Sequence, residues 1–237
     1  QPSKEEMEQR LKKARARLEQ QQILMKEKKL PVLVLLEGWG AAGKGSVLGK
    51  IIKNIDPRFF KVAVMDEPTE EEARKPFLYR HFVKIPEAGK FVFMDSGWMS
   101  EVTREKLRGE LSEQDNGYLL MKFFFQIDEK EQKKRLDKLA DDKNTSWRVS
   151  EHDVWQNKHY DKCMDVYEQY LCDTNQSSAP WYLVDAKDKK WAQLQILETL
   201  VQGIDTALQN STLAVPLLQN AFPLKPIEKL ADVALDK

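Results

Sequence analysis

The sequence predicts an α/β fold in which helices cover both faces of an open, mostly parallel sheet. Short unbroken apolar runs recur along the chain, and stretches whose apolar residues have helical spacing lie between them. Such runs are typical of parallel strands buried on both faces. Because strand alternates with helix, one sheet covered on both sides accommodates all of them.

The expected elements follow one another in a regular order along the chain. The predicted strands are 32–36, 62–65, 91–94, 119–125 and 181–184. The predicted helices that follow the first strand are 45–53, 70–82, 103–111, 129–140, 150–171 and 189–208. This order predicts one large domain over residues 31–208.

Two segments flank this domain. Ser3 and Glu6 have the spacing of a capping box, and charged residues separate the apolar positions that follow, so residues 1–30 are expected to form an amphipathic helix. The tail 209–237 has no clear periodicity and contains Pro223 and Pro226. It is expected to be a linker or an arm.

Composition excludes several classes of function. The 38 basic and 38 acidic residues of this 237-residue chain cancel, which argues against a general nucleic-acid binder. No run approaches the roughly 18 apolar residues of a membrane span, and the N-terminus lacks a signal sequence. Cys163 and Cys172 fit neither a redox nor a metal motif. A cytoplasmic protein without nucleic-acid or membrane partners is expected.

A glycine-rich loop directly follows the first predicted strand. Residues 38–46 read GWGAAGKGS and precede a predicted helix. Backbone amides, a helix N-terminus and a lysine in this order hold phosphate groups, so the phosphate-binding candidates are Gly38, Gly43, Lys44, Gly45 and Ser46. A strict P-loop has Ser or Thr directly after the lysine, whereas Gly45 stands there. The alternative is a tight strand-to-helix turn without a ligand.

A carboxylate ends another apolar strand. Phe91–Met94 is followed by Asp95, an arrangement in which the carboxylate holds Mg²⁺ beside a phosphate loop. Ligands of open parallel sheets gather at the carboxyl ends of the strands, so Asp95 and Lys44 are expected to meet. The alternative for Asp95 is a helix cap.

Five dispersed motifs resemble the polyphosphate kinase 2 family, in order over residues 8–208. They are the loop EGWGAAGKG from Glu37, PTEEE from Pro68, Asp95 with Trp98, SWRVS from Ser146 with Asp153, and APW from Ala179. The resemblance implies a P-loop NTPase-like, thymidylate-kinase-like fold with a helical lid at about 135–160. It also implies phosphate transfer between polyphosphate and AMP or ADP with Mg²⁺.

Roles for single residues come from the same resemblance. It implies catalytic roles for Lys44, Asp95, Arg135 and Arg148, with Asp95 also binding metal. Arg80 would bind phosphate, while Arg135 and Arg148 would belong to the lid. The chain is most similar to the first half of two-domain polyphosphate:AMP phosphotransferases, so a second kinase-like domain is an expected partner. The other expected partner is a second copy of this chain, because an amphipathic first helix could form the interface of a homo-oligomer.

The chain also departs from the family pattern at charged positions. Gly40 replaces a loop aspartate, Glu67 a basic residue, Ser96 an arginine and Leu139 a second lid arginine. The stretch 110–117 is shorter than in family members. These changes favour an alternative, a catalytically degenerate domain that binds phosphate or polyphosphate without turnover. An ATP-dependent kinase of similar fold is a third possibility.

Other aromatic and imidazole residues carry weaker signals. His152 and His159 lie seven apart on a predicted helix, but no third metal ligand has suitable spacing, so surface histidines are expected. Trp155 and Trp181 are expected in the core, whereas the resemblance places Trp147 near ligand.

Overall fold

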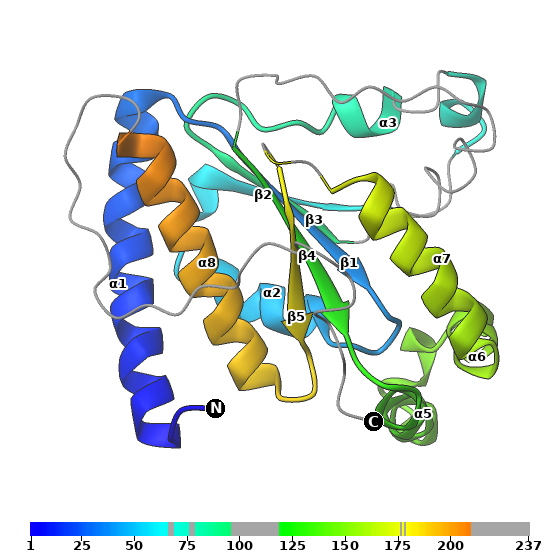
Figure 1. Cartoon of the computed structure of the whole chain (residues 1–237). Helices are drawn as coiled ribbons and strands as arrows, with labels where there is room; N and C mark the ends of the chain where they lie inside the picture. The colour runs from blue at the N-terminus through cyan, green and yellow to red at the C-terminus, as the bar shows by residue number, and fades with distance from the viewer. Residues whose placement is uncertain (66–68, 76–78, 96–118, 176, 178, 210–237) are drawn as a thin grey trace.

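The computed structural model describes residues 1–65, 69–75, 79–95, 119–175, 177 and 179–209. Their centre is a five-stranded parallel sheet in the order β2-β3-β1-β4-β5, drawn in Figure 1. The strands are β1 (Val32–Gly38), β2 (Phe60–Val64), β3 (Phe91–Asp95), β4 (Leu119–Gln126) and β5 (Trp181–Asp185). The predicted α/β class with a parallel sheet is confirmed.

Strand position explains the apolar runs. β1 lies between β3 and β4, and every residue from Val32 to Glu37 is buried. β2 is an edge strand, and its Val62 and Val64 are exposed. A central strand covered on both faces has no polar side to present, so the alternation of polar and apolar residues disappears there.

Helices cover both sides of the sheet. α1 (Lys4–Lys28) and α8 (Lys189–Gln209) pack side by side on one side, and α7 (Tyr160–Asp173) lies on the other (Figure 1). The remaining α-helices are α2 (Lys44–Ile52), α3 (Tyr79–Phe82), α5 (Glu129–Asp141) and α6 (Glu151–Lys158), and the 3-10 turns are η1 (Pro57–Phe59), η2 (Glu72–Arg74) and η3 (Ser146–Arg148).

α1 and α8 are joined by two ion pairs between arginine and carboxylate. Arg10 donates through Nε and Nη2 to the two carboxylate oxygens of Glu198 at 2.9 and 2.5 Å. Arg17 makes the same two-pronged contact with Asp205 at 3.2 and 2.6 Å, and the Asp205 side chain is completely buried. Both pairs therefore fix the register of α1 along α8.

The start of α1 agrees with the sequence prediction, while other predicted elements need correction. The Ser3 side chain accepts from the Glu6 amide and caps α1. The predicted helix 150–171 is two helices, because His159 leaves the helical conformation between α6 and α7. In the described part of 70–82, only η2 and the short α3 occur.

Two predicted segments lie outside the described residues: the helix 103–111 and most of the tail, of which only Gln209 is described, as the end of α8. Within the described part of the chain, no helix is both long enough and apolar enough to cross a membrane.

Candidate active site

The glycine-rich loop connects β1 to α2 at the carboxyl end of the sheet. Lys44, the first residue of α2, bends back so that its Nζ donates to the carbonyl oxygens of Gly38 at 3.0 Å and Trp39 at 3.2 Å. The next two residues, Gly45 and Ser46, are exposed in the first helical turn. Amides of a first turn have no acceptor within the helix, so those of Gly45 and Ser46 are available to an anion.

Gly43 caps α2 in a conformation that suits glycine. Its φ is +98°, a value that side-chain-bearing residues rarely adopt, and its carbonyl accepts from the Val47 amide at 3.0 Å. A Cβ atom at Gly43 would lie 3.3 Å from Cε of Lys189. The start of α8 therefore packs directly against the loop.

Asp95 ends β3 beside the start of α2, as the sequence predicted. A Cβ atom at Gly45 would lie 3.4 Å from Oδ2 of Asp95, and β3 pairs with β1 through Asp95 and Leu36. Burial raises the pKa of Asp95 above its ordinary value, and the charge of Lys44 partly opposes this rise. The carboxylate and the lysine thus act on one another at the mouth of the loop.

The surroundings of Asp95 fit a hydrated magnesium ion. Among the described residues, no group of three or more His, Cys, Asp or Glu side chains could hold a metal. Mg²⁺ is usually held by one or two carboxylates, with waters and substrate phosphates as further ligands. A single carboxylate beside a phosphate loop therefore matches that ligand set. A cation would also favour the charged form of Asp95, which burial disfavours.

Arg135 of α5 is directed at backbone carbonyls. Its Nε donates to Glu131, its Nη1 to the carbonyls of Ala42 at 3.0 Å and Ala41 at 3.5 Å, and its Nη2 to those of Ala186 and Lys187 at 2.9 and 2.8 Å. A guanidinium has five N–H donors. In this conformation all of them are used: one binds Glu131 on the same helix, and the other four tie the phosphate loop to the β5–α8 connection.

Lys189 adds positive charge on the same side of the loop. Partial burial, together with the nearby charges of Arg135, Lys50 and Lys138, lowers the pKa of Lys189. A bound anion relieves the repulsion that lowers the pKa of a lysine among like charges. Arg135, Lys50, Lys138 and Lys189, called here the basic cluster, thus extend the loop's preference for anions toward α5 and α8.

Trp39 anchors the loop in the protein interior. Its ring is completely buried, stacks on Tyr160 with the centroids 4.0 Å apart, and meets the edge of Tyr167. Its Nε1 donates to Oε1 of Gln126 at 2.8 Å. Because Tyr160 and Tyr167 belong to α7, this helix fixes the loop from the side opposite α8.

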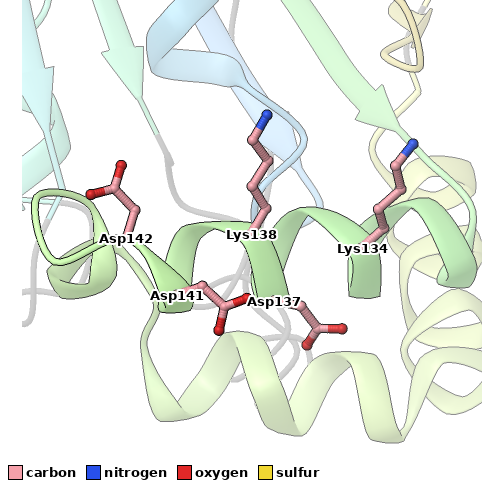
Figure 2. A pocket seen from close by; sticks show the side chains of 5 residues that line it. All are labelled: Lys134, Asp137, Lys138, Asp141 and Asp142. Atoms are coloured by element: carbon pink, nitrogen blue, oxygen red, sulfur yellow. The ribbon is translucent and has the colours of Figure 1, made fainter.

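A shallow hollow of about 610 Å³ lies along α5, and Lys138 of the basic cluster is part of its lining. It is lined by Lys134, Asp137, Lys138, Asp141 and Asp142. Figure 2 shows the two lysines on one side of the helix and Asp137 and Asp141 on the other. Its lining comes from one helix and the residue that caps it, and its charges are mixed. It therefore lacks the convergent groups of a catalytic site.

The other predicted site residues are less closely joined to the loop. Arg80 is buried on α3, and the pKa of Glu72 is lowered mainly by a hydrogen bond from the Thr69 amide, with a smaller contribution from the charge of Arg80. Arg148 lies in η3, where its guanidinium stands 5.1 Å from the centroid of the Trp147 ring, and that ring is 75% exposed. The structure therefore brings together Lys44, Asp95 and Arg135, whereas it contains no contact between Arg148 and the loop in the described part.

Of the two tryptophans predicted to lie in the core, one is buried and the other is not. Trp181 is completely buried and donates to Thr174, as expected of a core residue. The prediction for Trp155 is wrong, because this ring is half exposed and stacks between His152 and His159 on the surface of α6.

Of the four departures from the family pattern, Glu67 and Ser96 lie outside the described residues, as do 110–117.

Sequence reasoning missed Lys189, Gln132 and Gln156. Lys189 follows the last strand by a few residues, at the edge where ligands of parallel sheets gather, so its position was a usable signal. Gln132 and Gln156 are buried polar residues on amphipathic helices that contact Gly40. Nothing in the local pattern separates them from solvent-facing glutamines.

The parallel sheet, the loop after β1 and the carboxylate after β3 define a P-loop fold of kinase type. A sequence model described as polyphosphate kinase 2 (PPK2) matches residues 1–116 and 110–212. The chain therefore belongs to the polyphosphate kinase 2 family.

Individual relatives agree with this assignment. A polyphosphate:AMP phosphotransferase from Pseudomonas syringae pv. tomato is 30% identical over 210 residues, which are 81% of this chain and 42% of that protein. An ADP-polyphosphate phosphotransferase 3 from Rhizobium meliloti is 26% identical over 190 residues, 73% of this chain and 67% of that protein. Their names do not support the alternative of a degenerate domain.

A solved structure supports the fold. The crystal structure of polyphosphate kinase 2 from Arthrobacter aurescens TC1 superposes with a TM-score of 0.77 at 24% identity, covering 92% of this chain and 84% of that one. The chain spans less than half the length of the polyphosphate:AMP phosphotransferase it matches.

Proposed function

We propose that this chain transfers phosphoryl groups between polyphosphate and a nucleotide, AMP or ADP, at the loop Gly38–Ser46. The observation that carries the proposal is the meeting of Lys44 and Asp95 at the carboxyl end of the sheet, where the two charges influence one another. A cation site next to an anion cradle suits phosphoryl transfer, in which positioning and charge stabilisation supply most of the catalysis.

The basic cluster supports polyphosphate as the phosphate donor. Lys189 and its neighbours continue the positive charge beyond the loop toward α5 and α8. A nucleoside triphosphate carries only three phosphates and then a sugar and a base, whereas polyphosphate continues as a uniform polyanion. The basic cluster beside the loop therefore suits polyphosphate better than a nucleoside triphosphate.

Each group has a distinct part in the reaction. The first-turn amides of α2 bind phosphate oxygens, and Lys44 leaves its carbonyl partners to neutralise the oxygens that gain charge during transfer. Asp95 would hold magnesium, and a bound magnesium ion would neutralise further phosphate charge. Arg148, and Arg80 on α3, supply positive charge to the bound phosphates. Closure of the lid, residues 135–160, excludes water as a competing acceptor.

The comparison also bears on partners. The relative from P. syringae is more than twice as long as the matched region, which supports a second kinase-like domain, or a second copy of this chain, as a partner of this catalytic domain. A protein of this kind acts in the cytoplasm, where its nucleotide acceptors are found.

The test is a transfer assay followed by ³¹P NMR. The purified chain is incubated with polyphosphate, magnesium and either AMP or ADP, beside a Lys44→Met variant. The proposal expects nucleotide phosphorylation that depends on polyphosphate and is lost in the variant. Absence of product with both acceptors, or product that Lys44→Met leaves unchanged, contradicts it.

A further inference from the structure

The peptide groups around Gly40, in the middle of the phosphate loop, are held by two buried glutamines. The Gly40 amide donates to Oε1 of Gln156 at 3.0 Å, and its carbonyl accepts from Nε2 of Gln132 at 3.4 Å. Gln132 is completely buried and Gln156 is 3% exposed. The loop is thereby joined to α5 and α6, which overlap the predicted lid at about 135–160.

The two glutamines belong to one directed chain of hydrogen bonds. Asn157 donates to Oε1 of Gln132 at 3.0 Å, and Gln132 donates to Oε1 of Gln156 at 2.7 Å. Gln156 in turn donates to the Tyr167 hydroxyl. The Gly40 amide can only donate, so Oε1 of Gln156 must face it. This orientation then fixes the donor and the acceptor in every other hydrogen bond of the series. Buried networks of this kind specify one arrangement strongly when every member is satisfied.

A close approach of α6 accompanies these bonds. A Cβ atom at Gly40 would lie 2.0 Å from Oδ1 of Asp153, so a side chain at this position would force the Asp153 carboxylate to move. Oδ2 of Asp153 is held by the amide and the hydroxyl of Ser150 in the capping box of α6. The carboxylate is therefore held against the loop, and a residue larger than glycine at position 40 would have to displace it from the cap of α6.

We propose that Gln132 and Gln156 are positioning residues for phosphoryl transfer, which hold the Gly40 peptide and thereby set the phosphate loop relative to the lid helices. This rests on the transfer activity proposed above. It also gives Gly40 a structural reason other than the loss of a catalytic carboxylate. An aspartate introduced at position 40 would collide with Asp153 and lower activity rather than raise it.

The first test replaces Gln156 by side chains of similar size. Gln156→Met keeps the volume but removes the acceptor for the Gly40 amide, and the proposal expects kcat to fall about tenfold while KM for AMP stays within about twofold. Gln156→Glu, when protonated, reproduces both the acceptor and the donor. Its activity should approach that of the wild type at low pH and decline as the carboxyl ionises.

A merely structural role would give Gln156→Met and Gln156→Glu parallel pH profiles. That result, or a wild-type kcat in folded Gln156→Met, overturns the proposal. If Gln156→Met does not fold, Gln132→Met is measured in the same way with the same expectation and the same contradiction.

The second test is a double-mutant cycle at the close contact. Gly40→Ala is expected to lower kcat about tenfold or more, and Asp153→Ala in the same chain is expected to restore part of the loss by removing the carboxylate. Asp153→Ala alone measures the effect of losing the cap of α6. Unchanged activity in Gly40→Ala, or no coupling between the two substitutions, contradicts the close-contact account.

Hydrogen exchange separates this inference from the proposed function. In the ligand-free chain, Gln156→Met should speed amide exchange in residues 38–46 while leaving β5 unchanged. This readout needs no turnover, so a wild-type chain without transfer activity would refute the proposed function and still leave the positioning role measurable. Equal exchange of residues 38–46 in wild type and variant overturns the positioning role.

Discussion

Charged side chains differ between two regions of the molecule: they form ion pairs between α1 and α8, whereas charged groups around the phosphate loop have pKa values shifted toward the neutral form. Between the helices, Arg10 and Arg17 each grip both oxygens of a buried carboxylate on α8. At the loop, the pKa of Asp95 is raised and that of Lys189 is lowered, so both groups are pushed toward their neutral forms. The charges between α1 and α8 are therefore neutralised within the protein, without a ligand.

The difference indicates which charges serve stability and which serve a ligand. An arginine that shares two hydrogen bonds with a carboxylate gains nothing from an added ion. A carboxylate with a raised pKa gains from a cation, and a lysine with a lowered pKa gains from an anion. Asp95 and Lys189 flank the same loop, so a metal ion with a polyphosphate satisfies both. Substitutions between α1 and α8 should therefore lower stability, whereas substitutions at the loop should lower transfer activity or ligand affinity.

The largest effect is expected from Arg17→Met, which leaves the fully buried Asp205 without its partner. Such uncompensated burial costs about 3–5 kcal/mol, so the free energy of unfolding in urea should fall by this amount. Transfer activity of the folded fraction should not change. The double variant Arg17→Met/Asp205→Leu should recover most of the stability, and a loss below about 1 kcal/mol in the single variant would contradict the role given to this pair.

Lys44→Met should produce the next largest effect. Loss of a charge directed at the transferring group typically costs about 10²–10³-fold in rate, so transfer should fall by that factor. The melting temperature should change little, because Lys44 Nζ contacts only backbone carbonyls in the described structure. The matched control is Lys53→Met, an exposed lysine at the end of α2. Equal losses in the two variants would remove Lys44 from the mechanism.

A smaller effect is expected from Lys189→Met. One charge-assisted contact is worth about 1.5–3 kcal/mol, so the affinity for polyphosphate at low salt should fall by about tenfold to a hundredfold. Calorimetric titration with tripolyphosphate and with longer chains measures this, again beside Lys53→Met. The loss should shrink as salt is added. An unchanged affinity would exclude Lys189 from the anion path.

Asp95→Asn should have the smallest effect on stability, and in the opposite direction. A raised pKa means that the folded state holds the proton more tightly than the unfolded chain does. Wild-type stability therefore falls as pH rises from 3.8 through the raised pKa, and asparagine removes this loss. Without metal at neutral pH, the melting temperature of the variant should therefore be higher than that of the wild type. A lower melting temperature would contradict the burial argument.

The sheet and the loop could be predicted because their signals are local. β1 lies between two other strands under helices on both faces, so its whole run had to be apolar. The loop had to combine glycines and lysine between a strand and a helix. The order of elements then placed Asp95 beside Lys44, since parallel strands end at the same edge.

Other features depend on contacts between distant segments and left no local pattern. The break at His159 separates α6 from α7, where Tyr160 stacks on Trp39 of the loop. Four contacts of Arg135 join segments that are far apart in the sequence, and family resemblance alone assigned this residue to bound phosphate. Helical periodicity is equally satisfied with or without such contacts.

Proton uptake on polyphosphate binding tests the central claim most directly, namely that a ligand completes the charges at the loop. Tripolyphosphate is titrated at about pH 9, without metal, in two buffers that differ in ionisation enthalpy. An anion beside Lys189 raises its lowered pKa, so the wild type should take up more protons than Lys189→Met. Equal uptake by the two proteins would contradict the account.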